Sequence, residues 1–346
     1  MRFIQFATAV LTAIFLTAAH APAYEAEKEM LFEGTGDDEL RIISTTDIEV
    51  FQPLIEAFQK RHPTLTILYV QASSTAVFDA VTTSPEDHFD LAISSAMDLQ
   101  TKAANDGFAM DFGSSTTASF PPWSRWRNQV FGFSQEPAVL VASRDAFIGM
   151  AAPGSRPELI ELLRTHPDWF RGKIGTYDVR TSGLGYLFAT QDARQSDGFW
   201  RLAEVMGSLS PKLYCCSSSM IEAIESQDIL LAYNVLGPYA QARIKANGNA
   251  VIIPLSDYTN VMMRSVLIPT QATNPQSAGQ FIDFLLSTPG RQLLELEAGL
   301  PPLVPNSLNT SDSLRPIKLG PGLLVYLDRL KRKKFLEEWE NSILQN

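Results

Sequence analysis

The stretch that decides the fold of this chain is Gly172-Lys-Ile-Gly-Thr-Tyr-Asp-Val-Arg-Thr-Ser-Gly-Leu-Gly-Tyr-Leu-Phe-Ala189. Ile174 and Tyr177 predict a short strand, and the apolar side chains from Leu184 onward predict the first turn of a helix. Between them lie hydroxyls and free backbone N–H groups at a helix N-terminus, where the helix dipole stabilises anions. Serine and threonine there also commonly cap their own helix. The stretch therefore predicts either a simple helix cap or a cap that also binds a ligand.

The N-terminal part of the chain repeats this order of strand, hydroxyl-rich turn and helix. Residues 39–43, 64–70 and 89–93 have the composition of buried strands. Each is followed by serine or threonine and then by a helical pattern, as at 50–58. Such alternation indicates an α/β fold with a parallel, doubly wound sheet. Ligands of such sheets bind beyond the carboxyl ends of the strands. The three hydroxyl-rich turns therefore predict a ligand-binding site at the carboxyl edge of this sheet.

A second lobe is expected to follow the aromatic-rich loop near residues 110–135. Later patterns predict strands and helices as far as an amphipathic C-terminal helix at 324–344. The expected order of segments is a signal peptide at 1–23, the first part of lobe 1 at 24–135, lobe 2 at 136–262, and a return to lobe 1 with the C-terminal helices at 263–346.

The first residues have the features of an export signal. One early charge, Arg2, precedes an apolar run from 7 to 19 and the ending Ala21-Pro-Ala23. This pattern is typical of a cleaved secretory signal rather than of a membrane span, so the mature chain is expected in the periplasm. Removing the one charge changes the net charge from −10 to −11. Such an acidic chain argues against a nucleic-acid partner and against unaided binding to anionic lipid.

The two cysteines of the chain are adjacent, at Cys215 and Cys216. Neighbouring cysteines seldom reach disulfide geometry without strain, so no structural disulfide is expected even in an oxidising compartment. The pair matches neither a zinc nor a redox spacing, and both side chains are expected to be small packing residues. The fold must therefore depend on its apolar core, for which a composition of 45% hydrophobic residues suffices.

Several segments together resemble the periplasmic solute-binding proteins of ABC importers, in the branch of the ferric-ion-binding proteins and their organic-phosphate-binding relatives. The likeness extends over residues 40 to 294. It is carried by Phe58-Gln-Lys-Arg-His-Pro-Thr-Leu-Thr-Ile, Phe89-Asp-Leu-Ala-Ile-Ser-Ser, Gly172-Lys-Ile-Gly with Thr181-Ser-Gly183, residues 218–234, and Ala278-Gly-Gln-Phe-Ile-Asp-Phe-Leu-Leu-Ser-Thr-Pro-Gly-Arg291. The resemblance implies a two-lobed periplasmic-binding-protein fold of type II, each lobe a doubly wound sheet, with a hinge and a solute in the cleft.

The resemblance also provides a test for iron. Ferric-binding members have two adjacent tyrosines after the strand that corresponds to 228–234. This chain has Asn234-Val-Leu-Gly-Pro238 there, and Tyr233 and Tyr239 flank it without forming an adjacent pair. Hard ferric iron needs anionic oxygen ligands, and neutral hydroxyls and amides bind it poorly. No metal ligand and no cofactor are therefore expected, although a ferric-binding protein with atypical ligands stays an alternative.

The candidate site residues are mainly neutral donors at strand ends and helix starts in both lobes. Together with helix N-termini and the cation Arg180, they suit a phosphate, sulfonate or carboxylate ligand. Each hydroxyl could instead serve only as a helix cap. The predicted ligand-binding residues are Thr45, Thr46, Ser73, Ser74, Ser94, Ser95, Arg180, Thr181, Ser182, Gly183, Ser218, Ser219, Tyr233 and Asn234.

These features favour a monomeric binding protein that delivers a small anionic solute, phosphorylated or carboxylated, to an inner-membrane ABC permease. The same fold could instead dock on a sensor histidine kinase and report the solute. An exported enzyme is disfavoured, because the Gly-x-Ser-x-Gly and His-Glu-x-x-His motifs are absent from the sequence and the three histidines of the mature chain occupy unpromising positions. No catalytic residue is therefore expected.

Overall fold

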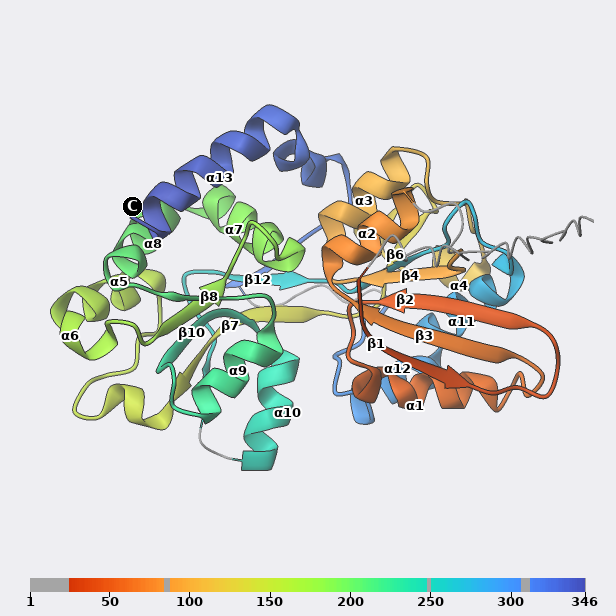
Figure 1. Cartoon of the computed structure of the whole chain (residues 1–346), viewed down its shortest axis with the longest axis horizontal. Helices are drawn as coiled ribbons and strands as arrows, with labels where there is room; N and C mark the ends of the chain where they lie inside the picture. Colours follow the sequence, from red (N-terminus) through yellow and green to blue (C-terminus); the bar gives the residue numbers. More distant parts are fainter. Residues whose placement is uncertain (1–24, 84–87, 248–249, 306–311, 346) are drawn as a thin grey trace, which may run out of the picture.

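The computed structural model describes residues 25–83, 88–247, 250–305 and 312–345, so the expected signal peptide at 1–23 lies outside the described residues. The described residues form two α/β lobes, each built around its own β-sheet and lying side by side (Figure 1). The expected two-lobed fold class is confirmed.

The sheet of the first lobe has the strand order β1-β3-β2-β4-β13-β6-β5. β2 runs parallel to both β3 and β4, so the three expected strands end at one edge of the sheet. The strand bounds are Ala26–Phe32 (β1), Glu39–Ser44 (β2), Thr66–Ala72 (β3), Leu91–Ser94 (β4), Arg125–Trp126 (β5), Val130–Gly132 (β6) and Ser265–Leu267 (β13).

Helices cover both faces of this first sheet. α1, α11 and α12 lie on one face, and α2 and α3 lie on the other (Figure 1). α1 forms because Phe51, Leu54 and Phe58 recur at helical spacing and are all buried against the sheet. The helix bounds in this lobe are Ile48–Gln59 (α1), Ser74–Thr83 (α2), Met97–Asn105 (α3), Ser115–Ala118 (α4), Pro122–Ser124 (η1), Pro275–Leu286 (α11) and Thr288–Leu296 (α12).

The sheet of the second lobe has the order β14-β12-β7-β10-β8-β9, and β11 also pairs with β7. β8 is parallel to β9 and β10, whereas β7 is antiparallel to β10 and β12. The strand bounds are Glu136–Ser143 (β7), Ile174–Tyr177 (β8), Lys212–Tyr214 (β9), Leu231–Leu236 (β10), Ala250–Ile253 (β11), Thr259–Met262 (β12) and Leu314–Pro316 (β14).

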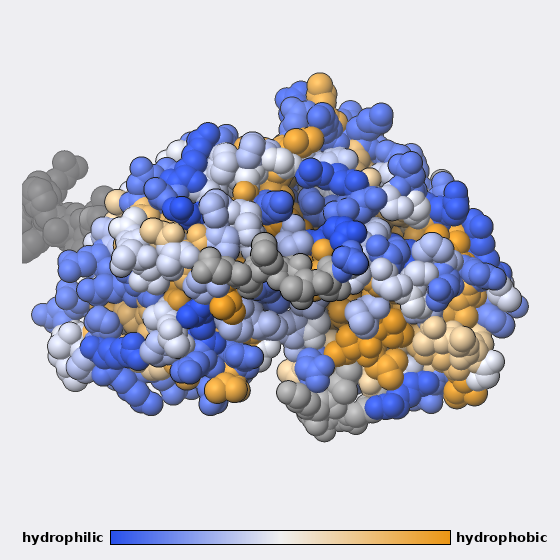
Figure 2. Space-filling model, turned by 180° about the vertical axis from the view of Figure 1, so that it is seen from behind, coloured by the Kyte–Doolittle hydropathy of each residue, from blue (hydrophilic) through white to orange (hydrophobic). Residues whose placement is uncertain are grey.

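Helices also flank the second sheet, with α7, α8 and α13 on one side and α9 and α10 on the other (Figure 1). Seen from behind, a notch at the lower edge separates the two lobes (Figure 2). The helix bounds are Arg144–Phe147 (η2), Arg156–Thr165 (α5), Pro167–Phe170 (α6), Gly183–Gln195 (α7), Gly198–Ser208 (α8), Ser217–Glu225 (α9), Gly237–Asn247 (α10), Pro321–Leu327 (η3) and Arg329–Ile343 (α13).

Two of the segments on which the chain crosses between the lobes, β6 to β7 and β12 to β13, lie side by side, and we call this pair the hinge. The N–H of Phe133 donates to the carbonyl of Arg264 at 2.9 Å. The fully buried Arg264 guanidinium binds both oxygens of Glu136, at 3.0 and 2.9 Å. Such a pair ties the segments together because losing one partner would leave a buried charge uncompensated.

Two parts of the chain differ from the sequence-based expectation. Before the first strand expected from the sequence, at 39–43, the chain forms an edge strand, β1, which pairs antiparallel with β3 and carries charged side chains that suit an exposed edge. The segment 263–346 returns to the first lobe only as far as α12. α13 packs on α8 of the second lobe, because Phe335, Trp339 and Ile343 share one face of α13 and are buried there.

In the described part of the chain, no helix combines the length and the apolar character needed to span a membrane.

Candidate functional site

A cavity of about 480 Å³ lies between the two lobes, at the carboxyl edge of the first sheet. Both lobes contribute hydroxyl groups to its wall. The predicted residues that line it are Thr45, Ser73, Ser74, Ser95, Thr181, Ser182 and Ser218. The hydroxyl turns of both lobes thus meet in one cavity, which we call the cleft.

Helix N-termini from both lobes reach the cleft. Ser73 caps α2, because its Oγ accepts from the N–H of Ala76 at 3.2 Å. Within the described residues, the N–H groups of Thr75 at the start of α2 and Ser218 at the start of α9 make no hydrogen bond. Free N–H groups and the positive ends of helix dipoles form an environment that favours an anion.

The lobes touch each other beside the cleft, where the N-termini of α2 and α7 meet. The N–H of Gly183 donates to Ser74 Oγ at 3.0 Å. A Cβ atom at position 183 would lie 2.6 Å from that Oγ and 3.1 Å from Leu99 Cδ1. Glycine is therefore required for this close approach. Ser182 caps α7 through the N–H of Gly185 at 3.2 Å, so its hydroxyl has both a structural contact and a place in the wall of the cleft.

A second contact between the lobes involves a carboxylate. Ser218 Oγ, at the start of α9, donates to Asp47 Oδ2 at 3.4 Å, and Gln71 donates to the other oxygen at 3.3 Å. Burial raises the pKa of Asp47 above its usual value, and the nearby Arg264 opposes this increase. Asp47 therefore places a partly buried acceptor in the cleft.

Both arginines that line the cleft are already paired with carboxylates. Arg264 binds Glu136 and also donates to Thr46 Oγ1 at 2.7 Å. Arg243 lies 3.6 Å from Glu222. Within the described residues, the cleft thus offers an incoming anion hydroxyls and N–H groups rather than an arginine free of a carboxylate partner.

Four predicted residues lie close to the cleft without lining it. Thr46 is fully buried and accepts from Arg264, and Ser94 Oγ accepts from the N–H of Ala96 at 3.1 Å. Ser219 Oγ lies 3.1 Å from the sulfur of Cys216. Gly183 forms the contact with the first lobe described above.

Arg180, the cation expected in the site, is placed outside the cleft. Its guanidinium binds the carboxylate of Asp178 at 2.8 and 2.6 Å and lies 4.0 Å from Glu340. The hydrogen bonds with Asp178 raise the pKa of Arg180. Because the turn is short, the Arg180 guanidinium lies close to the carboxylate two residues before it and binds that carboxylate instead of extending into the cleft.

Tyr233 and Asn234 also differ from expectation, because both side chains point into the second lobe. β10 has an irregular register between Ala232 and Val235, and Asn234 has a positive φ of 64°. The side chains of Tyr233 and Asn234 donate to the same oxygen of Asp192, at 2.9 and 2.7 Å. The irregularity thus turns both residues away from the cleft.

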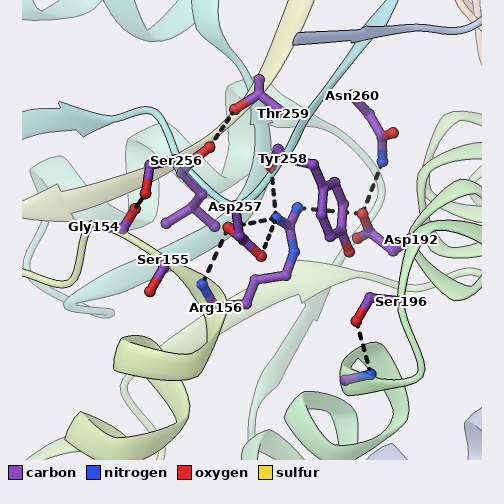
Figure 3. A network of polar contacts seen from close by, with 12 residues as sticks. Gly154, Ser155, Arg156, Asp192, Ser196, Ser256, Asp257, Tyr258, Thr259 and Asn260 are labelled. Carbon is purple, nitrogen blue, oxygen red and sulfur yellow. Dashed lines mark hydrogen bonds and ion pairs between the residues drawn. The ribbon is translucent and has the colours of Figure 1, made fainter. Parts of the chain in front are cut away.

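Asp192 is the centre of a buried polar network in the second lobe (Figure 3). Arg156 binds its other oxygen at 3.3 Å, and Asn260 donates to that oxygen at 2.8 Å. The Arg156 guanidinium also stacks 3.5 Å from the centre of the Tyr258 ring and contacts Asp257. These bonds connect α5, α7 and β12, so the network has a structural role in this lobe.

Sequence reasoning did not select several residues that line the cleft. Asp47 directly precedes α1, Arg264 lies between β12 and β13 at the hinge, and Tyr239 lies in the first turn of α10. Cys215 and Cys216 line the cleft as well, rather than packing in the core. In the sequence, the position of the two cysteines directly before a turn of three serines could have indicated that they line the cleft.

In the described part of the chain, no three His, Cys, Asp or Glu side chains gather in a geometry that could hold a metal ion.

A family model and solved structures both match this chain to bacterial solute-binding proteins. A family described as bacterial extracellular solute-binding protein matches residues 40–297. The substrate-binding protein of an ABC transporter from Agrobacterium tumefaciens is 31% identical, with 92% of this chain and 99% of that chain covered and a TM-score of 0.87. No curated protein matches the chain.

Two solved structures at lower identity share the fold. AfuA from Actinobacillus pleuropneumoniae, with exogenous fructose 6-phosphate bound, is 15% identical, with 89% of this chain and 99% of that chain covered and a TM-score of 0.72. Iron-bound HitA from Pseudomonas aeruginosa is 16% identical, with 88% and 99% covered and a TM-score of 0.69. At these identities the likeness concerns the fold alone.

Proposed function

Because the chain belongs to the bacterial extracellular solute-binding proteins, which deliver ligands to ABC permeases, we propose that it binds a small anionic organic solute for import. The solute is phosphorylated or carboxylated and sits in the cleft between the lobes. One observation carries this proposal: hydroxyls and helix N-termini from both lobes line a single cavity of about 480 Å³. The protein carries its solute without converting it, and it does so in the periplasm.

The anionic group would be bound by neutral donors. The free N–H of Thr75 and the hydroxyls of Ser73 and Ser74 face it from the first lobe, and the N–H of Ser218 faces it from the second. Neutral donors at helix N-termini stabilise phosphate and carboxylate groups without a matching ion pair. The paired states of Arg243 and Arg264 fit this mode of binding.

The remainder of the solute is expected to carry hydroxyl groups. Asp47, Glu222 and Glu27 line the same cavity and are acceptors when ionised, so they suit the O–H donors of a polyol or sugar. A sugar phosphate or a hydroxylated carboxylate combines both features. AfuA, which shares the fold, was solved with fructose 6-phosphate bound.

Closure of the lobes would follow from contacts that need both lobes. Gly183 already reaches Ser74, and Ser218 reaches Asp47, across the boundary. A solute that binds donors on both sides adds further contacts that exist only when the lobes are together. It therefore shifts the population toward the closed form.

Ferric iron is the weaker candidate for this site, although iron-bound HitA shares the fold. The position after β10 reads Asn234-Val-Leu-Gly-Pro238, without two adjacent tyrosines. Tyr233, which precedes it, donates its hydroxyl to Asp192 inside the second lobe. Iron would therefore lack the anionic oxygen ligands that it requires.

A calorimetric screen over sugar phosphates, phosphonates, dicarboxylates and ferric citrate tests the proposal. A phosphorylated or carboxylated compound should bind, and the double variant Ser74→Ala/Ser218→Ala should weaken its binding by roughly tenfold to a hundredfold, because each hydroxyl contributes about 1 kcal/mol. Ser119→Ala is the matched control, since Ser119 is exposed and bonds only within its own turn. Equal affinity of the double variant and the control would remove these hydroxyls from the site.

A further inference from the structure

The only two cysteines of the chain lie side by side in the wall of the cleft. Both are free thiols, and Cys215 is exposed. Their sulfur atoms are 2.7 Å apart, and Ser219 Oγ lies near both of them. A solute or a small oxidant that enters the cleft therefore meets two thiols that have no other cysteine in the chain to pair with.

We propose that Cys215 and Cys216 are a reversible redox pair, and that their oxidation to a vicinal disulfide alters the second lobe's wall of the cleft. The redox chemistry rests on the two thiols alone. Its effect on the bound solute rests on the function proposed above.

The surroundings of the pair favour a reactive thiolate. Cys216 occupies the N-cap position of α9, so both sulfurs lie at the positive end of a helix that is nine residues long. Hydrogen bonding from Cys216, with a smaller contribution from Ser219, lowers the pKa of Cys215 to about 6 despite partial burial. The Cys215 sulfur and burial raise the pKa of Cys216. The exposed thiol is thus the attacking group, and its neighbour keeps its proton until the second step.

The reaction requires a disulfide as the oxidant, such as oxidised glutathione or the active-site disulfide of a thiol oxidase. The Cys215 thiolate attacks one sulfur of the oxidant RS–SR, a mixed disulfide forms, and RS⁻ leaves. The Cys216 thiol then gives its proton to solvent and attacks Cys215 Sγ, which displaces the second RS⁻. Two cysteine thiols have lost two electrons and two protons, and RS–SR has been reduced to two RSH.

Ring closure must change the backbone of this turn. Adjacent Cα atoms are about 3.8 Å apart across a trans peptide, whereas disulfide-linked Cα atoms are usually at least about 4.4 Å apart. Cys216 has φ −153° and ψ 163°, the extended conformation of the N-cap of α9. A strained and exposed disulfide is easily reduced, which makes the modification reversible.

The two residues that follow the cysteines, Ser217 and Ser218, line the cleft, so a change in the backbone of the turn moves them directly. Ser217 Oγ accepts from the N–H of Leu236 at 2.9 Å and bonds the Tyr177 hydroxyl at 2.7 Å. Ser218 makes the contact with Asp47 in the first lobe. Oxidation of Cys215 and Cys216 shifts the first turn of α9 and weakens the Ser218–Asp47 contact. The affinity of the cleft for its solute then falls.

Intact mass spectrometry of the full mature protein in oxidised glutathione tests the redox pair. The wild type should become two hydrogen atoms lighter without an added glutathione and should recover its mass in dithiothreitol. Cys216→Ser should retain a glutathione on Cys215, because its resolving thiol is missing. A wild-type protein that keeps its mass, or that also retains the glutathione, would overturn the proposal.

Hydrogen exchange then tests the effect on the cleft without any ligand. The amides of Met220 and Leu236, which donate to the Cys216 carbonyl and to Ser217 Oγ, should exchange about tenfold faster in the oxidised wild type than in the reduced one, and the oxidant should not change exchange in Cys215→Ser/Cys216→Ser. Identical exchange in both forms would overturn the coupling. Calorimetry with fructose 6-phosphate adds a separate arm: weaker binding after oxidation supports the coupling, and equal binding contradicts it. Absence of binding by the reduced protein counts against the sugar-phosphate proposal alone.

Discussion

The backbone N–H of Gly183 in the second lobe donates a hydrogen bond to Ser74 Oγ in the first lobe, over 3.0 Å. This bond joins the N-termini of α7 and α2 beside the cleft. It is possible only because residue 183 has no Cβ, which would lie 2.6 Å from the same oxygen. The contact therefore depends on how closely the lobes approach each other.

Gly183→Ala should hold the lobes apart. The added methyl group contacts Ser74 and Leu99 of the opposite lobe, so the closed form is destabilised while each lobe keeps its own core. Small-angle scattering should report a larger radius of gyration than for the wild type, and solute affinity should fall about tenfold, equivalent to about 1.4 kcal/mol.

Gly113→Ala is the matched control for this variant. Gly113 is exposed in the first lobe, and a Cβ there meets nothing within 4 Å. The control should keep the radius of gyration and the affinity of the wild type. If Gly183→Ala behaves in the same way as the control, the contact with Ser74 does not limit closure.

Asp47→Asn should strengthen the binding of an anion. The Asp47 carboxylate lines the cleft, and its charge repels an anionic group nearby by about 1 kcal/mol or more at a solvated site. The amide keeps the size of the side chain and can still accept from Ser218. Calorimetry with the anionic solute should give a several-fold lower dissociation constant. A cationic solute would instead bind more weakly to the variant, and that result would contradict an anionic ligand.

Arg264→Met should destabilise the hinge. It leaves the buried carboxylate of Glu136 without its partner, which typically costs about 3–5 kcal/mol. The double variant Arg264→Met/Glu136→Leu removes both charges and should regain most of this loss. Urea unfolding measures the three proteins. A single variant within about 1 kcal/mol of the wild type would show that the pair contributes little.

Asp98 should make stability depend on pH. It lies on α3 and is only 3% exposed, where α3 packs against α7 and η3. Burial raises the pKa of Asp98 to about 7, and the hydrogen bond from the backbone N–H of Leu99, with a smaller contribution from the charge of Arg332, opposes this increase. Because the pKa is higher in the folded protein than in the unfolded chain, ionisation disfavours folding. The contribution of Asp98 is therefore present below about pH 4 and is lost as the pH rises to about 7, a change of about 4 kcal/mol.

The variant Asp98→Asn removes this dependence, since the amide does not titrate and can still accept from the N–H of Leu99. Urea unfolding between pH 4 and pH 8 should show the free energy of unfolding falling more steeply for the wild type than for Asp98→Asn. Parallel curves for the two proteins would mean that Asp98 has an ordinary pKa.

The sequence predicts those parts of the fold that depend on local patterns. The strand and helix around Gly183 are recognisable because apolar spacing changes from strand to helix across a hydroxyl turn, and the turns at Thr45 and Ser74 follow the same rule. The turns at Thr45 and Ser74 meet because the parallel strands β2 and β3 end at one edge of the first sheet. Periodicity and capping therefore predict the first lobe's side of the cleft, whereas the approach of the second lobe's turn depends on tertiary contacts.

The sequence does not reveal where individual side chains point. The irregular register of β10 turns Tyr233 toward Asp192, and a bulge of this kind leaves no clear sequence signal. Arg180 has the carboxylate of Asp178 two residues away, and whether the two side chains bind depends on the conformation of the turn, which the sequence does not specify. Nor does an amphipathic pattern identify the lobe that receives Trp339 and its helix. These features depend on contacts between residues far apart in the chain.

Native mass spectrometry of the protein purified from its host tests the central claim most directly. If the cleft binds a small anionic solute, the protein should carry one organic compound that contains a phosphate or carboxylate, and Gly183→Ala should carry much less of it. Release of that compound by denaturation would allow its identification. A bound ferric ion with a phenolate-to-metal absorption band, or a bound solute without an anionic group, would contradict the proposed function.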